Sequence, residues 1–231
     1  MIFDVLLVIG AYLFGSVPVL FWIGKSKGID IRWESDSHSA LWKKAGHKQG
    51  LTAVLWDLFK GPVPPLIAWG FDLGSLTIGL SGLAVTAGQM WPVFLGFRYG
   101  EKGNTTGIGA SFAIAPVAMS FAAIPVAAGA LTRALKGKGK TVAGSESDDS
   151  RLSGVSDSMP LGMLCGFAVL PIAAFLLHKD IETIWVFTGL FFLIVFRRLT
   201  ADLTSEWRQG FKASLASVFW NRFLYDRSYY D

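Results

Sequence analysis

The sequence predicts an all-α integral membrane protein with about seven transmembrane helices and an amphipathic C-terminal helix at the membrane interface. Two observations carry this prediction. Of the 231 residues, 52% are hydrophobic and only 16% are charged, whereas about 25% of residues are charged in a typical soluble domain. Several apolar runs approach or exceed the ~18–20 residues that cross a bilayer. The net charge is only +4, and we find none of the basic and stacking clusters that nucleic-acid binding requires.

The first expected span covers residues 1–24 and is interrupted by Gly15, Ser16 and Pro18. Because proline lacks a backbone N–H, Pro18 should kink the helix in its inner half. The Ser16 hydroxyl then either bonds a freed backbone carbonyl or contacts a substrate.

A polar loop is expected over residues 25–50, and it contains His38 and His47. Two histidines in a loop without a neighbouring cysteine are a weak indication of a metal site. We therefore expect both histidines at the surface, and predict neither a metal nor another cofactor.

Residues 51–70 form the second expected span, which includes Asp57 and Lys60. Ionisable groups inside a span are costly and usually mark a partner or a functional site. At this spacing on a helix the two side chains share a face and could pair. Alternatively, Lys60 extends to the interface and leaves Asp57 near the inner boundary. The prolines that follow, Pro62, Pro64 and Pro65, should bend or break the helix.

The third expected span, residues 74–97, leads into a glycine-rich loop from Arg98 to Gly107. Glycines let backbone N–H groups turn toward a ligand, and Lys102 beside them supplies a point charge. A phosphate-bearing substrate needs that combination. A tight turn between two spans with ordinary interfacial cations would give the same pattern, so both interpretations stay open.

Charge placement predicts the topology. Basic residues dominate four segments, 25–48, 98–102, 133–140 and from 197 onward, and the positive-inside rule places all four on the cytoplasmic side. Residues 108–135, with Pro116 and Pro125, must therefore enter the membrane and return, as two short spans or a re-entrant hairpin. Spans at 159–178 and 183–196 complete seven, with the N-terminus outside and the C-terminus cytoplasmic. Cys165, in the first of these two spans, is expected to be a buried, inert thiol.

The tail, residues 204–231, is expected to form a unit separate from the seven-helix domain of residues 1–203. Apolar and basic residues alternate in it near helical spacing: Trp207, Arg208, Phe211, Lys212, Leu215, Val218, Phe219 and Arg222. This pattern predicts an amphipathic helix on the inner leaflet. A docking element for another membrane subunit would show the same pattern.

Several motifs, taken in order, match a known family. They are Tyr12-Leu13-Phe14-Gly15-Ser16-Val17-Pro18, Ile23-Gly24-Lys25, Lys27-Gly28-Ile29-Asp30-Ile31-Arg32, Asp57-Leu58-Phe59-Lys60-Gly61, Gly88 to Phe97, Arg98 to Thr106, and Arg151-Leu152-Ser153-Gly154-Val155-Ser156. Their order and spacing, over most of the chain, resemble the bacterial acyl-phosphate-dependent glycerol-3-phosphate acyltransferases.

The resemblance implies seven transmembrane helices in the bacterial plasma membrane and an active site open to the cytoplasm. It implies acyl transfer from acyl phosphate to the 1-hydroxyl of glycerol 3-phosphate, giving lysophosphatidate without CoA or a metal. The catalytic residues would be Lys102, Ser153 and Lys60. A second set would contact substrate: Arg32, Ser16, Asp57, Gly103, Thr106, Ser156 and Arg198.

The chain also departs from the family pattern. The glycines and asparagines of the family's Ser-Gly-Asn loop are absent from residues 35–44, where Asp36 would repel phosphate. Gln89 and Arg198 each replace a histidine, and Ala201 replaces an asparagine. Three functions stay open. The first is a divergent membrane glycerol-3-phosphate acyltransferase. The second is a catalytically degenerate homologue that serves as an accessory subunit of a membrane complex, through the C-terminal tail. A lipid-binding or transport module using the same pocket is a third.

Overall fold

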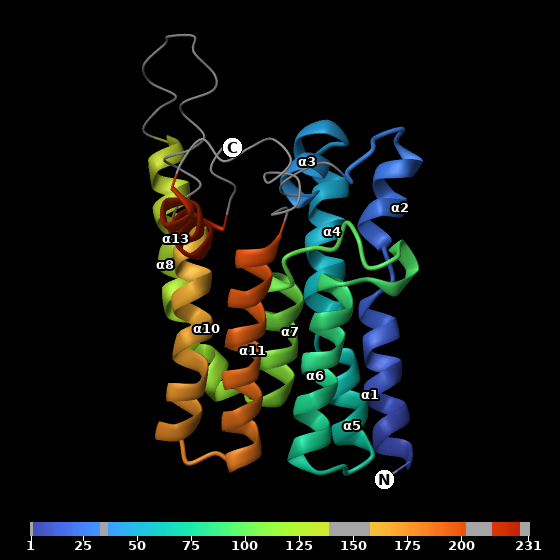
Figure 1. The fold of residues 1–231 in the computed structure, drawn as a ribbon, viewed down its shortest axis with the longest axis vertical. Helices are drawn as coiled ribbons and strands as arrows, with labels where there is room; N and C mark the ends of the chain where they lie inside the picture. Colours follow the sequence, from blue (N-terminus) through green and yellow to red (C-terminus); the bar gives the residue numbers. More distant parts are fainter. Residues whose placement is uncertain (1, 33–36, 139–157, 202–213, 227–231) are drawn as a thin grey trace.

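The computed structural model describes residues 2–32, 37–138, 158–201 and 214–226. In these ranges the chain is an upright helical bundle whose N-terminus lies at one end (Figure 1). The helices are α1 (Ile2–Gly15), α2 (Val19–Ser26), α3 (Ser37–Lys44), α4 (His47–Lys60), α5 (Val63–Gly70), α6 (Ser75–Met90), the 3-10 turn η1 (Val93–Leu95), α7 (Asn104–Ile114), α8 (Pro116–Lys138), α10 (Ser158–Leu176), α11 (Ile181–Thr200) and α13 (Leu215–Tyr225).

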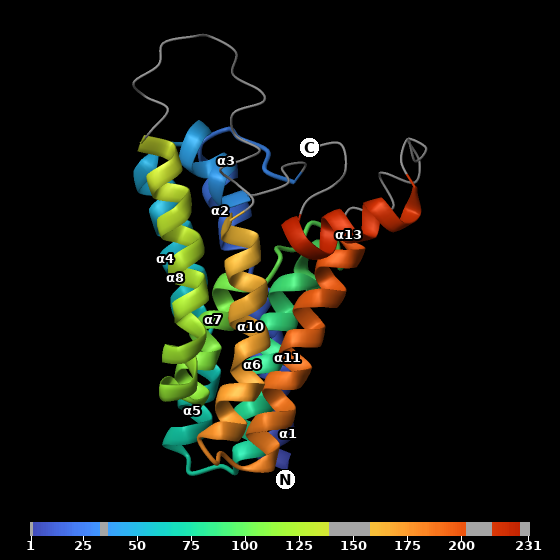
Figure 2. The same cartoon turned by 90° about the vertical axis from the view of Figure 1, so that its left-hand side faces the viewer.

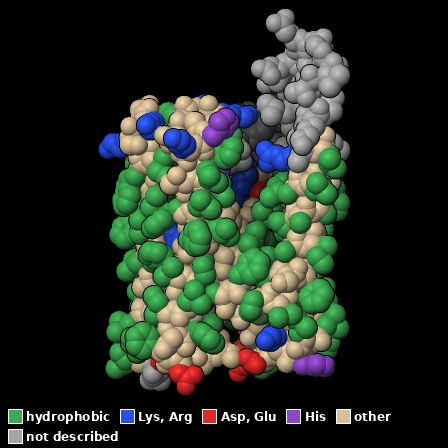
Figure 3. Space-filling model, turned by 180° about the vertical axis from the view of Figure 1, so that it is seen from behind, with side chains coloured by type: hydrophobic (Ala, Val, Ile, Leu, Met, Phe, Trp, Pro, Cys, Tyr) green, Lys and Arg blue, Asp and Glu red, His purple; other side chains and the backbone are tan. Residues whose placement is uncertain are grey.

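The bundle has the surface of a multi-pass membrane protein. In the described part of the chain, five helical segments are long and apolar enough to cross a bilayer: Ile2–Ser26, Ser75–Leu95, Pro116–Arg133, Ser158–Leu176 and Ile181–Thr200. Hydrophobic side chains cover the flank, and basic and acidic groups gather at opposite ends (Figure 3). The broken pair α4 and α5 coincides with the second expected span, and the total of seven spans stays a prediction.

Two predicted helix breaks are confirmed. The first helix ends at Gly15 and α2 begins after Pro18, and a second break separates α4 from α5 at Gly61–Pro62. Gly15 also has a packing role, because a Cβ there would lie 2.1 Å from the Val85 carbonyl oxygen of α6. A Cβ on Gly88 would meet the Tyr12 carbonyl oxygen at the same distance. Helices α1 and α6 therefore pack backbone against backbone.

The region between Arg98 and Arg133 enters the bundle and returns, as charge placement predicted. The hairpin is asymmetric, however, because α7 has only 11 residues and α8 has 23. The turn lies at Ala115–Pro116, and Pro125 sits inside α8 rather than ending a helix. The expectation of a short hairpin is thus correct for one arm only (Figures 1 and 2).

Two local expectations were wrong. Residues 25–50 are not a loop, since they contain α3 and the start of α4. Gly50 permits this folding, because a Cβ there would meet Trp42 at 2.7–2.8 Å. The third expected span coincides with the apolar segment Ser75–Leu95, which is α-helical to Met90 and ends in the turn η1. Cys165 is exposed on α10 rather than buried.

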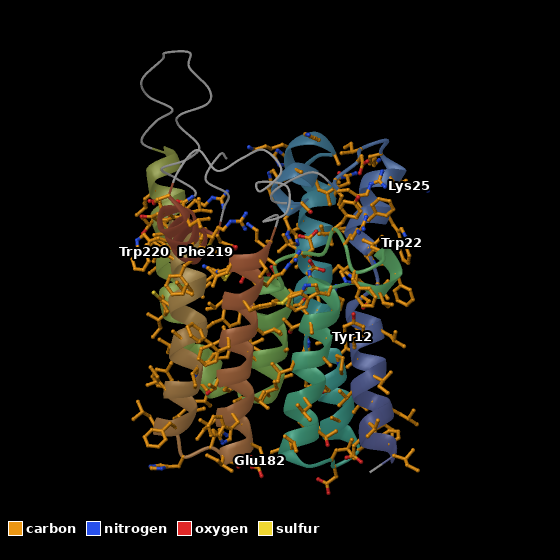
Figure 4. All side chains as sticks on the ribbon, viewed as in Figure 1. Tyr12, Trp22, Lys25, Glu182, Phe219 and Trp220 are labelled. Carbon is orange, nitrogen blue, oxygen red and sulfur yellow. The ribbon has the colours of Figure 1, made fainter. Side chains whose placement is uncertain are left out.

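The described parts of the four basic segments lie toward one end of the bundle (Figure 1). Figure 4 shows Lys25 at this end and Glu182 at the other. Which end faces the cytoplasm stays a prediction from charge. The largest apolar core lies between α8, α10 and α11, with Phe167, Phe187 and Leu190 among its buried side chains.

The C-terminal helix α13 lies across the basic end of the bundle and packs on α10 and α11 (Figure 2). Val218 is fully buried against them, and a guanidinium nitrogen of Arg222 donates to the Ala201 carbonyl. Leu215 and Trp220 are 54% and 64% exposed, and Figure 4 places Phe219 and Trp220 at this helix. The described part of the tail is thus an amphipathic helix, while Trp207 and Phe211 lie outside the described residues.

Candidate active site

A buried ionic network lies between α4, α3 and α6. Asp57 is completely buried, and its Oδ1 lies 3.2 Å from the Lys60 Nζ. Gln89 Nε2 donates to Asp57 Oδ2 at 2.5 Å, and His38 Nε2 lies 2.9 Å from the same oxygen. The predicted pairing of Asp57 with Lys60 is confirmed. The surface position expected for His38 is wrong, because its ring reaches this network.

Lys60 is held inside the bundle and does not extend to the interface. Its side chain is only 3% exposed, and Nζ donates to the Gly15 carbonyl at 3.3 Å. That carbonyl is available because α1 ends at Gly15. The break that the sequence predicted at Ser16–Pro18 therefore supplies an acceptor for the buried ammonium group.

The short helix α7 holds this network from the opposite side. The Thr106 hydroxyl donates to the Asp57 backbone carbonyl at 3.0 Å. Close approach of the two backbones requires glycine, since a Cβ on Gly61 would lie 2.2 Å from the Thr106 carbonyl oxygen. A Cβ on Gly109 would lie 2.1 Å from the Leu58 carbonyl oxygen. The Thr106 hydroxyl thus helps to fix the backbone of Asp57.

A pocket opens beside the network, between the α1–α2 break and the loop after α6. It encloses about 440 Å³ of empty space, part of which is open to solvent. Its polar lining residues are Ser16, Arg32, Ser37, Asp57, Lys60, Gln89, Tyr99 and Glu101. Val17, Pro18, Leu20 and Leu95 supply an apolar wall. Four residues that the sequence predicted for the site therefore share one cavity: Ser16, Arg32, Asp57 and Lys60.

The Ser16 side chain is already engaged. Its hydroxyl is fully buried and donates to the Tyr12 carbonyl at 2.8 Å. This bond supports the structural alternative for Ser16, while its place in the pocket lining leaves substrate contact a prediction.

Arg32 lies at the exposed rim of the pocket. It forms a fork with Asp30, with Nη2 2.7 Å from Asp30 Oδ2 and Nε 2.9 Å from Oδ1. The Arg32 guanidinium holds the pKa of the Asp30 carboxyl at about 2, below its ordinary value of 3.8. Arg32 also lies 5.7 Å and 5.8 Å from the ring centroids of Phe21 and Tyr99. Aromatic walls hold the cation in reach of the pocket.

The glycine-rich loop is held against α6 and α11. A Cβ on Gly100 would lie 2.0 Å from the Met90 carbonyl oxygen, so only glycine fits there. Arg197 of α11 donates to the Gly100 carbonyl at 2.5 Å and to the Glu101 carbonyl at 3.3 Å. Gly103 has φ +75° and starts α7, a conformation that favours glycine. The loop is therefore fixed by tertiary contacts with α6 and α11 and does not merely connect two helices.

Lys102 points away from the pocket, toward α13. Its Nζ donates to the backbone carbonyl of Asp226 and lies 3.7 Å from Asp226 Oδ1. Asn104 Nδ2 donates to Asp226 Oδ2 at 3.4 Å. Among the described residues, Gly100 and Glu101 line the pocket and Lys102 does not. The structure thus separates Lys102 from Lys60 and Arg32.

Arg198 belongs to the same cluster as Lys102. It is 1% exposed, and its guanidinium donates to the Pro160 carbonyl at 3.0 Å and to the Phe223 carbonyl at 3.4 Å. Its Nε lies 3.9 Å from Asp226 Oδ2. Substrate binding by Arg198, Gly103 or Thr106 stays a prediction. Ser153 and Ser156 lie outside the described residues.

Sequence reasoning missed His38, Asn104 and Asp226 as members of these two clusters. Each is distant in sequence from its partner, since His38 and Asp57 are 19 positions apart and Lys102 and Asp226 are 124 positions apart. No local spacing signals such pairs. Gln89 was noted only as a replacement, although its position at the end of α6 could have suggested an inward side chain.

The fold and the site define an all-α integral membrane protein with a pocket that both cations and carboxylates line. Comparison with known proteins identifies the family. The family described as glycerol-3-phosphate acyltransferase matches residues 5–144. The glycerol-3-phosphate acyltransferase of Geobacter metallireducens is 35% identical over 122 residues, which cover 52% of this chain and 62% of that protein. Glycerol-3-phosphate acyltransferase 4 of Dehalococcoides mccartyi is 30% identical over 94% of this chain and 85% of its own.

The chain belongs to the glycerol-3-phosphate acyltransferase family. The fold agrees, since the crystal structure of PlsY, an integral membrane glycerol 3-phosphate acyltransferase in its glycerol 3-phosphate form, superposes with a TM-score of 0.65 at 24% identity. That likeness covers 93% of this chain and 98% of PlsY.

Proposed function

We propose that this protein transfers an acyl group from acyl phosphate to the 1-hydroxyl of glycerol 3-phosphate, in the bacterial plasma membrane, with its C-terminus cytoplasmic. Family membership supports the acyl transfer. The observation that carries the proposal is the pocket in which Lys60 and Arg32 lie beside buried Asp57. A phosphate group needs such cations and N–H donors, and the apolar wall beside them suits the start of an acyl chain.

In the proposed reaction the 1-hydroxyl oxygen forms an ester bond to the acyl carbon. The bond from that carbon to the phosphate oxygen breaks, and phosphate leaves with the electron pair. The hydroxyl proton passes to the departing phosphate or to solvent. The chain's residues supply binding and orientation. Asp57 and the Gly15 carbonyl fix Lys60, while Arg197 and the backbone of α6 fix the glycine-rich loop. Preorganised cations stabilise charge where it develops on the leaving phosphate.

One observation favours a second candidate function, that of a non-catalytic subunit of a membrane complex. Lys102, the expected catalytic lysine, is bound to Asp226 of the C-terminal helix rather than open to the pocket. In that case α13 would stabilise the bundle and bind a partner, and its exposed apolar side chains would contact lipid or another subunit.

The experiment that separates the two uses the purified full chain in nanodiscs with palmitoyl phosphate and glycerol 3-phosphate, and measures phosphate and lysophosphatidate together. We expect equal release of both products. Lys60→Met should abolish release, because it removes the ammonium group that is paired with buried Asp57 in the pocket. Lys179→Ala, at an exposed position on the opposite end, is the matched control and should match wild type. Well-folded protein that releases neither product would favour the subunit function.

A further inference from the structure

The C-terminal helix places a carboxylate against two cations of the glycine-rich loop region. Asp226 ends α13 and is only 6% exposed. Its oxygens are approached by Lys102, Asn104 and Arg198, which come from the loop, α7 and α11. Three elements distant in sequence thus converge on one acidic group.

This carboxylate fits its surroundings imperfectly. Arg198 Nε is buried and makes no hydrogen bond among the described residues, because Asp226 Oδ2 stays 3.9 Å away. Asn104 Nδ2 reaches the same oxygen at a long 3.4 Å. A buried N–H without an acceptor is costly, so the Arg198 Nε has hydrogen-bonding capacity that Asp226 does not use.

The charge balance points the same way. Lys102 and Arg198 bring two positive charges to one carboxylate, and the N-terminus of the 11-residue helix α7 begins at the same place. Helix N-termini favour negative charge. A phosphate group carries more charge than a carboxylate, and its oxygens point in several directions. It could therefore form short hydrogen bonds with the donors that lie far from Asp226, namely Arg198 Nε and Asn104 Nδ2.

We propose that Asp226 is an intramolecular competitor for a phosphate-bearing ligand at Lys102, and that α13 must move for such a ligand to bind there. This inference rests on the proposed function, in which Lys102 contacts substrate phosphate. The tail then lowers the affinity of the site, and displacement of α13 restores it.

The position of α13 allows such displacement. The helix packs on α10 and α11 and projects outward from the bundle (Figure 2), and it is held on the inside by Val218, Arg222 and the Asp226 cluster. Its outer face carries Leu215, Phe219 and Trp220, exposed by 40–64%. A lipid surface can bind such a face and compete with the bundle for the helix.

The test compares wild type with Asp226→Asn in nanodiscs. Asp226 has φ +54°, a left-handed conformation that asparagine also tolerates, so the change removes charge without straining the backbone. The matched control is Asp72→Asn, since Asp72 has the same φ of +54° and lies on the loop between α5 and α6, at the opposite end of the bundle. We measure the dissociation constants of inorganic phosphate and glycerol 3-phosphate by calorimetry, and KM and kcat for palmitoyl phosphate.

We expect Asp226→Asn to bind the phosphate probes at least about tenfold more tightly, the scale of one lost competing charge, and Asp72→Asn to match wild type. Adding Lys102→Ala should remove the gain. Val218→Asp, which expels α13 while keeping both cations, should reproduce the gain and covers the case in which Asp226→Asn disturbs folding.

Unchanged or weaker phosphate binding in both variants would overturn the competition, and so would the lack of phosphate binding in every protein. Tighter binding without acyl transfer would retain the competition and refute only the acyltransferase function.

Discussion

The buried pair of Asp57 and Lys60 allows a quantitative test of the site's architecture. Both side chains are almost fully buried, at 0% and 3% exposure. Lys60→Met leaves the Asp57 carboxylate without its cation, and Asp57→Leu leaves the Lys60 ammonium with only the Gly15 carbonyl. Each single change should cost about 3–5 kcal/mol, the usual result of leaving one buried charge unpaired.

The double variant separates charge pairing from packing. If the two effects were independent, the double variant would lose roughly 6–10 kcal/mol. We instead expect about 1–3 kcal/mol, because neither member of the buried pair remains and the main loss is that the Gln89 amide and the His38 ring no longer have the Asp57 oxygen as their partner. Since about 1 kcal/mol shifts Tm by ~2–4 °C at this chain length, each single variant should melt about 6–20 °C lower.

The assay is thermal unfolding of the four proteins in one detergent, followed by tryptophan fluorescence, with SDS titration as the second measurement. Asp72→Asn, on the loop between α5 and α6, is the control, and its free energy of unfolding should stay within about 0.5 kcal/mol of wild type. A double variant whose loss equals the sum of the single losses would refute the reasoning, because it would show that the two charges do not depend on each other.

Two further predictions follow from local geometry. Gly109→Val should destabilise the bundle by more than about 1–3 kcal/mol, because its Cβ would lie 2.1 Å from the Leu58 carbonyl oxygen, whereas Gly10→Ala, with nothing within 4 Å, should leave Tm unchanged. Asp30 should titrate at about 2, and near 3.8 in Arg32→Gln. Because the folded pKa is the lower one, the Asp30–Arg32 pair contributes above pH about 3.8 and is lost as pH falls toward 2. Infrared carboxylate bands followed from pH 8 to pH 1.5 would show this, and equal midpoints in both proteins would contradict it.

Local chemistry in the sequence predicted much of the fold. Gly15 and Pro18 indicated the break in the first helix, and the spacing of Asp57 and Lys60 indicated that their side chains share a face. Charge placement indicated that the chain enters and returns between Arg98 and Arg133. These features depend on a few neighbouring residues or on the membrane, so short segments encode them.

The candidate site was only partly predictable, because its remaining contacts join distant segments. His38 reaches Asp57 only because α3 folds back against α4, which depends on the absence of a side chain at Gly50. Lys102 meets Asp226 only because α13 crosses the bundle end. Basic residues and a glycine-rich loop predicted an anion site, but not that the chain supplies an anion of its own.

The shortness of α7 bears on the fate of a reactive acyl donor. Its 11 residues span about 16 Å, roughly half of the ~30 Å hydrocarbon layer, so the chain turns back before completing a crossing. The glycine-rich loop at its start consequently lies below the tips of α4 and α8 (Figure 1). In the proposed function, an acyl phosphate bound at that depth would meet bulk water only through the open side of the pocket. Transfer to a second bound substrate would then compete favourably with hydrolysis, because the surrounding lipid limits access of the competing nucleophile.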